Sequence, residues 1–194
     1  MAVVVETFDS TKITNGSIQV LGTDGNQVPG KPFGCIGSVE GETEIKEIIK
    51  ICEGVETNKV SKPIKMNLTL SGHIQVNVLR DIFGLQNTTL KAGVYSYNVK
   101  SLPKEFTFTA DVVDEFGDQT KLIAFPRVKA TSGLKITISN NEDELAEIEL
   151  ELTAYPDSAD NFYYEAIVSE LADQTLANTW HTTFNYDLVK ETVL

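Results

Sequence analysis

The feature that most constrains the fold is a repeated alternation of apolar and polar residues along the chain. A β-strand turns successive side chains to opposite faces, so a strand with one buried face has a period of two. Many short alternating strands separated by turns are typical of an antiparallel sandwich or barrel. We therefore predict a mainly β fold of two packed antiparallel β-sheets, sandwich-like or barrel-like. The alternation is clearest in four segments: Ile64 to Ser71, Phe106 to Val112, Leu134 to Ser139 and Ala146 to Thr153.

Weaker patterns extend this prediction and add one helix. Val76, Leu79 and Phe83 recur at helical spacing, and Gly84 can end the helix, so one α-helix is expected to flank the sheets. Further strands are expected at Ile18 to Leu21, Tyr95 to Val99, Lys121 to Phe125 and Phe162 to Val168.

The segment from Glu44 to Cys52 fits two structures. Ile45, Ile48 and Ile49 lie at helical spacing, yet isoleucine-rich segments favour β structure. We favour a strand, and in that case the stretch from Glu53 to Lys62 is expected to be a loop that links it to the strand beginning at Ile64.

The length of 194 residues suits a single domain, and a hydrophobic share of 41% is that of a globular chain. Patterning is weak before Ile13 and after Leu171. We expect flexible arms there, at about residues 1–12 and about 172–194, which order only against neighbours. The first residues lack the basic and apolar regions of a signal peptide, so folding is expected to start in a cytoplasm.

The residues that usually carry chemistry do not form a recognisable catalytic motif. His73 falls on the polar face of a strand, and His181 follows Trp180 in what is expected to be a packing anchor. Cys35 and Cys52 are interpreted as small buried hydrophobic residues, because neither has the spacing of a zinc site or disulfide framework. We therefore expect no enzyme activity and no cofactor.

Acidic residues dominate the charge. Asp and Glu outnumber Lys and Arg by 28 to 16, a net charge of -12, so the chain has no basic footprint for nucleic acid. The acidic turns at 111–118 and 141–144 lack the spacing of a calcium-binding loop, so no metal site is expected.

Glu147, Glu149 and Glu151 are the most informative charges. Alternation places all three on one strand face, where like charges repel. This face must therefore be wet or opposed by lysines on a neighbouring strand. The ordinary interpretation is a solvated sheet face; the functional one is the wall of a channel that is kept negative.

Several stretches resemble the major tail (tail tube) proteins of siphophages that infect Gram-positive bacteria. The likeness is one of overall pattern and spans about residues 30 to 184. Its segments are Gly37 to Gly41, His73 to Gly84, Phe106 to Ala110, Val113 to Asp118, Lys121 to Pro126, Asn140 to Leu152, Phe162 to Ala166 and Trp180 to Thr182.

The resemblance implies a structural subunit of a non-contractile tail tube. Subunits of that family form hexameric rings that stack into a tube, and one sheet of each subunit joins its neighbours around a lumen. Viral DNA passes through this lumen during ejection without specific binding. Glu147, Glu149 and Glu151 are then the candidate acidic lumen face, which would repel phosphates.

The resemblance also implies partners and a location. Partners would be other copies of the chain and other tail proteins (tape measure, distal tail and terminator proteins), with no membrane involved. The protein would reside in the virion tail after assembly in the host cytoplasm. A long loop and terminal arms make ring-to-ring contacts in the family; the counterparts expected here are the loop around Glu53 to Lys62 and the two arms.

Other functions stay open. The tube protein of a contractile tail, of a bacteriocin or of a type VI-like secretion system would share the fold. A carbohydrate- or receptor-binding β-sandwich should display exposed aromatic residues on one set of loops, whereas Tyr95, Tyr97, Tyr163 and Tyr164 are expected within strands. A hydrolase on a β-scaffold would need nucleophile and base motifs that the sequence lacks.

Overall fold

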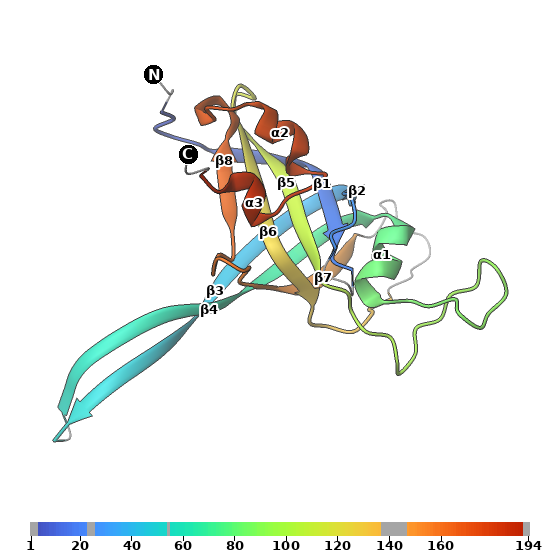
Figure 1. Ribbon diagram of the computed structural model, residues 1–194, viewed down its shortest axis with the longest axis horizontal. Helices are drawn as coiled ribbons and strands as arrows, with labels where there is room; N and C mark the ends of the chain where they lie inside the picture. Colours follow the sequence, from blue (N-terminus) through green and yellow to red (C-terminus); the bar gives the residue numbers. More distant parts are fainter. Residues whose placement is uncertain (1–3, 23–25, 54, 137–146, 192–194) are drawn as a thin grey trace.

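The computed structural model describes residues 4–22, 26–53, 55–136 and 147–191, and the predicted mainly β fold is confirmed (Figure 1). Three short helices accompany the strands: α1 (Val76–Phe83), α2 (Thr175–Trp180) and α3 (Tyr186–Val189), with a 3-10 turn at Val168–Glu170. The strands are β1 (Ser10–Val20), β2 (Lys31–Pro32), β3 (Gly34–Cys52), β4 (Val55–Ile74), β5 (Phe106–Asp114), β6 (Thr120–Ala130), β7 (Ile148–Tyr155) and β8 (Tyr164–Ile167).

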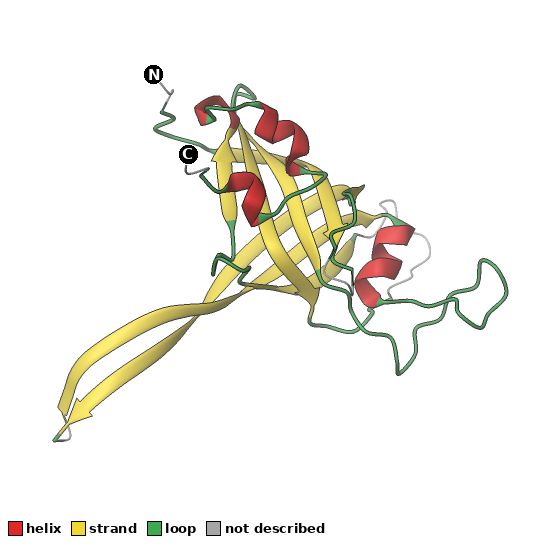
Figure 2. Cartoon of the chain, in the orientation of Figure 1, coloured by secondary structure: helices red, strands yellow, loops and turns green. Residues whose placement is uncertain are grey.

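The strands belong to one antiparallel sheet rather than to two separate sheets. Its order is β2-β1-β5-β6-β7-β4-β3, and β8 pairs with β6 beside this path. One edge of β6 is shared, because Lys121–Ala124 pair with β8 whereas Arg127–Ala130 pair with β7. The sheet therefore divides at β6 into two branches (Figure 2).

The core lies on the face of the sheet that the alternation predicted to be apolar. Leu68 and Leu70 of β4 stand opposite Leu152 and Leu150 of β7, and all four side chains are buried. The ring of Phe108 joins this core to its neighbours, with centroid distances of 5.6 Å to Phe33 and 6.4 Å to Phe125. Apolar burial of this kind is the main driving force for folding.

The predicted helix is confirmed as α1. Val78, Ile82 and Phe83 are buried against the core, and the helix ends at Gly84 with a left-handed φ of 64°. On the opposite side, Asp81 forms ion pairs with Lys31 at 2.9 Å and Lys104 at 2.6 Å. Partial burial alone would raise the pKa of Asp81, but the two lysines lower it overall and keep the carboxylate charged.

The segment from Glu44 to Cys52 is a strand, as favoured, but the loop expected from Glu53 to Lys62 is wrong. From Val55 onward these residues continue β4, with Ile48 paired to Val60 and Glu47 to Ser61. The hairpin of β3 and β4 therefore extends far beyond the body of the molecule (Figure 1). The isoleucine and valine residues on both strands favour extended backbone. The residues from Val55 to Lys62 are mostly polar, which alone suggests a loop, but they pair with β3.

Two other strand predictions are not confirmed. Tyr95 to Val99 lie in a long loop after α1, where an isolated bridge joins Gln86 to Ser96. Leu134 to Ile136 are not in a strand, and the remainder of that predicted strand lies outside the described residues. The acidic turn at 141–144 and Ala146 also lie outside them.

The C-terminal segment covers the second face of β1, β5 and β6, so it differs from the free arm expected at about 172–194. Trp180 and Phe184 are almost fully buried and pack with Leu122 and Ala124 of β6. Trp180 is the last residue of the short helix α2, and Phe184 lies between α2 and α3, so neither belongs to a periodic run. At the other end, β1 already begins at Ser10, within the stretch of about 1–12 expected to be an arm.

Replacing Trp180 with alanine should lower the free energy of unfolding by about 3–5 kcal/mol. The indole is 1% exposed, lies 4.5 Å from the Phe184 ring and donates its Nε1 hydrogen to the carbonyl of Ile123 at 3.0 Å. Urea denaturation measures the loss. Tyr186→Ala, at an exposed position of the same segment, is the control and should cost under about 1 kcal/mol; equal losses would contradict the anchoring role.

Candidate assembly surfaces

The predicted acidic residues Glu147, Glu149 and Glu151 lie together on the solvent side of the sheet. Glu149 stands opposite Ser71 and Glu151 opposite Thr69 in the pairing of β7 with β4. Glu147 directly precedes β7, and its carboxylate accepts a hydrogen bond from the Ser71 hydroxyl at 2.8 Å. All three are exposed. On β4 the residues opposite these acids are thus small hydroxyl residues, whereas on β6 Lys129 stands opposite Thr153, the next residue of β7 on the same face as Glu151.

The sequence analysis missed two further carboxylates on this face. Glu40 and Glu42 of β3 stand opposite Thr69 and Asn67 of β4, which places them in the same row as β7's acids. The sequence does contain a signal for them, an alternation of polar residues along β3 at Ser38, Glu40, Glu42 and Glu44. We define Glu40, Glu42, Glu147, Glu149 and Glu151 as the acidic face.

The acidic face is not neutralised within the described part of the chain. None of its five carboxylates takes part in an ion pair there, whereas Glu44, next along β3, pairs with Lys65 at 3.0 Å. One small residue supports the arrangement, because a β-carbon on Gly37 would clash with the Glu147 carboxylate. The resulting surface is wet and negative, and it disfavours close approach of other anions.

The outer half of the β3–β4 hairpin is the second unusual surface. It exposes, on both of its faces, aliphatic residues of a kind that a folded monomer normally buries, and Ile48 and Val60 stand directly opposite each other. Ion pairs accompany them, such as Lys59 with Glu47 at 2.6 Å. The exposed aliphatic residues are Ile45, Ile48, Ile49, Ile51, Val55, Val60 and Ile64.

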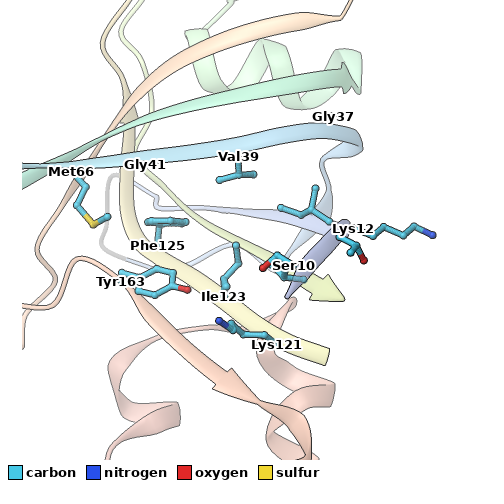
Figure 3. Close-up of a pocket in the computed structure, with 13 residues that line it drawn as sticks. Ser10, Lys12, Gly37, Val39, Gly41, Met66, Lys121, Ile123, Phe125 and Tyr163 are labelled. Carbon is cyan, nitrogen blue, oxygen red and sulfur yellow. The ribbon is translucent and has the colours of Figure 1, made fainter. Parts of the chain in front are cut away.

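An open groove of about 460 Å³ lies where the sheet does not close, between β1, β3 and β6 (Figure 3). Val39, Ile123 and Phe125 give it an apolar wall, whereas the charged end of Lys12 points away from it. Tyr163 lies at its side and donates a hydrogen bond to Glu165 at 2.9 Å. Burial, with this bond, raises the pKa of Tyr163, so its hydroxyl stays neutral.

The histidines take the structural roles expected of them. The ring of His181 contacts Asp111 at 2.8 Å through Nε2 and Thr109 at 2.9 Å through Nδ1, which ties the C-terminal segment to β5. His73 is exposed on its strand. The cysteines do not follow expectation, since Cys35 and Cys52 are both exposed rather than buried.

The acidic turn at 111–118 does not gather its carboxylates. Asp111 faces His181, while the carboxylate of Asp114 accepts hydrogen bonds from the backbone of Gly117 and Gln119. Within the described ranges, no three His, Cys, Asp or Glu side chains are grouped to hold a metal ion. Those ranges also contain no helix long and apolar enough to cross a membrane.

Comparison with solved structures gives a distant structural similarity. No protein-family model matches the chain, and no curated protein matches it either. A solved structure, the anti-feeding prophage cap (AFP tube terminating cap), aligns with a TM-score of 0.44 and 15% sequence identity. The alignment covers 84% of this chain and 94% of that one. This similarity is too distant to assign a function.

Proposed function

We propose that the chain is a structural subunit of a non-contractile phage tail tube. Its copies form hexameric rings that stack around a lumen, and viral DNA crosses this lumen during ejection. Its partners are copies of itself and the other tail proteins, and its place is the virion tail after assembly in the host cytoplasm. The role is mechanical and not enzymatic. The observation that carries the proposal is the projecting β3–β4 hairpin.

A projecting two-stranded hairpin is a poor element for a monomer. Two strands without a third strand or a covering helix are marginally stable in water. This hairpin also exposes seven aliphatic side chains, with Ile51 at 67% and Val55 at 65% of their full accessibility. An exposed apolar patch of this kind marks a surface that a partner covers. Burial against further copies of the chain would stabilise the hairpin.

The free edge of β3 supports the same conclusion. Among the described strands β3 ends the sheet, so its edge away from β4 has no strand partner there along Gly34–Cys52. Long unpaired edges promote pairing with another chain. Contacts between different surfaces of identical subunits close into rings or continue as open filaments. In a tube of stacked rings, one contact closes the ring and another continues from ring to ring.

The acidic face supports the conduction of DNA. A wall of unneutralised carboxylates repels phosphates, and the repulsion is strongest within about 8–10 Å at physiological salt. Duplex DNA that moves along such a wall does not bind to it. We therefore assign the acidic face to the lumen as part of the proposal.

Negative-stain electron microscopy of the purified protein over a range of concentrations tests the proposal. We expect rings or hollow tubes, with a matching rise in sedimentation coefficient. A protein that sediments as a monomer at every concentration and shows no rings contradicts it. A sheathed tube would give the same images, and a neighbouring sheath gene would then favour the contractile or secretion-system alternative.

One observation favours a second candidate, a carbohydrate- or receptor-binding module. Tyr95 and Tyr97 are exposed on a loop and not within a strand, and Arg80 lies 3.8 Å above the Tyr95 ring. Exposed aromatic rings on a loop suit the binding of sugars or peptides. Binding assays with saccharide panels and with Tyr97→Ala test this candidate: specific binding that is lost in the variant, without assembly, would favour it.

A further inference from the structure

The loop between α1 and β5 is the least explained part of the described chain. It runs from Gly84 to Glu105 without a helix or strand and projects from the body (Figure 1). Loops of this length in compact domains usually have a function. Leu85 packs against the core, but several apolar side chains of the loop are exposed, with Val99 and Leu102 among the most exposed in the molecule.

The loop is nevertheless held in one shape. Gln86 and Ser96 exchange two backbone hydrogen bonds at 3.1 and 2.9 Å, and the Asn87 side chain donates to the Val94 carbonyl at 2.6 Å. Further on, the Lys100 backbone donates to Asn98 Oδ1 at 2.8 Å. A surface organised before binding loses less entropy when a partner docks.

A hollow of about 370 Å³ lies within this loop. Leu90 and Val99 are its apolar lining residues. Thr88, Asn98 and Lys100 line it with polar groups. The apolar pair is thus part of an otherwise polar lining, so the hollow offers a small apolar contact beside hydrogen-bonding groups.

The charge of the loop differs from that of the molecule. The net charge of the chain is -12, yet the stretch from Leu85 to Lys104 contains three lysines and no acidic residue. Lys104 pairs with Asp81. Lys91 and Lys100 have no ion-pair partner in the described part of the chain, so the loop presents two free positive charges.

The tip of the β3–β4 hairpin has the complementary character. Its charged residues between Ile51 and Thr57 are Glu53 and Glu56, which have no ion-pair partner among the described residues. Val55 between them is exposed, and so is Ile51, which stands opposite Glu56. Lys50 lies just inside the tip, opposite Asn58, so the acidic character is confined to Glu53 and Glu56 beyond it.

We propose that the hairpin tip of one copy docks on the α1–β5 loop of a second copy, with aliphatic side chains of the tip in the hollow and Glu53 and Glu56 beside Lys91 and Lys100. The two surfaces project from opposite ends of the long axis (Figure 1). Each copy therefore offers both halves of the contact to different neighbours. This inference rests on the proposed function and specifies the contact by which the subunits associate.

Charge reversal tests the contact. Glu53→Lys with Glu56→Lys gives a tip variant, and Lys91→Glu with Lys100→Glu gives a loop variant. Either variant alone brings like charges together at every contact, so we expect association to be lost at concentrations where the wild type assembles. In a 1:1 mixture the contacts between unlike variants again join opposite charges, so assembly should return. Sedimentation velocity measures association and electron microscopy measures its products.

Matched controls carry the same charge changes elsewhere. Glu115→Lys with Asp118→Lys, and Lys12→Glu with Lys190→Glu, alter exposed residues outside both surfaces and should assemble normally. Circular dichroism verifies folding. If the wild type forms rings or tubes and either tip or loop variant does so equally, the contact is wrong although the proposed function stands. A mixture that fails to assemble also overturns the contact. A wild type that remains monomeric contradicts both proposals.

Discussion

Removal of the outer half of the β3–β4 hairpin should abolish assembly and leave the rest of the molecule folded. The variant replaces residues 45–64 with Asn-Gly, so that only this two-residue turn separates Glu44 from Lys65. These two residues are paired in the native register and form an ion pair at 3.0 Å. A two-residue Asn-Gly turn is favoured between antiparallel strands, so the shortened hairpin should close without strain.

The expected separation of folding from assembly follows from burial. Every large aliphatic residue that the deletion removes is exposed, and none belongs to the buried core. The melting temperature should therefore stay within a few degrees of the wild type, whereas rings and tubes should disappear from micrographs. Such a loss shows that the hairpin is needed for association and not for the fold.

A double substitution tests the same surface without shortening the hairpin. Ile48 and Val60 stand directly opposite each other, so Ile48→Asp with Val60→Asp places two repelling charges on one side of the hairpin. Asn58→Ala with Ser61→Ala keeps the aliphatic surface and serves as the matched control. We expect the first pair to prevent assembly and the second to leave it unchanged. If the variant with the shortened hairpin formed normal tubes, the hairpin would not be needed for assembly, and the proposed function would lose its main support.

Local patterning predicted the β-strands with one buried face and the helix α1. Leu68, Leu70, Leu150 and Leu152 alternate with polar residues because one side of their strands meets the core, and this signal lies within each segment. The alternation also indicated that Glu149 and Glu151 share a face, as the register shows. Their role as a channel wall is a proposal and depends on how several copies meet.

Features that depend on distant contacts were not predictable in this way. The pairing of β6 with both β7 and β8, which makes one sheet of the expected two, involves segments far apart in the sequence. The burial of Trp180 depends on Ile123 and Phe184 and not on a periodic run. The length of the hairpin depends on cross-strand pairs such as Ile48 with Val60, which neither strand reveals alone.

Replacing Glu147, Glu149 and Glu151 with lysine should slow or block DNA ejection from phage particles built with the variant subunit. The change converts three repelling charges per subunit into three charges that bind phosphates. Around a hexameric ring the effect is multiplied sixfold under the proposed function. Contacts between lysine and phosphate weaken steeply with salt, so the block should be strongest at low salt and should ease as salt rises.

A neutral variant separates charge from shape. Glu149→Gln with Glu151→Gln keeps the size of both side chains and removes repulsion without adding attraction, so ejection should fall between the wild type and the lysine variant. Glu147 is left unchanged in this control because its carboxylate accepts the Ser71 hydrogen bond. Counting emptied particles over time measures ejection, and electron microscopy verifies that tubes have formed. If tubes form and all three proteins eject DNA at the same rate at low salt, the acidic face does not line the lumen, because DNA within a Debye length of six such surfaces would respond to the reversal of their charge.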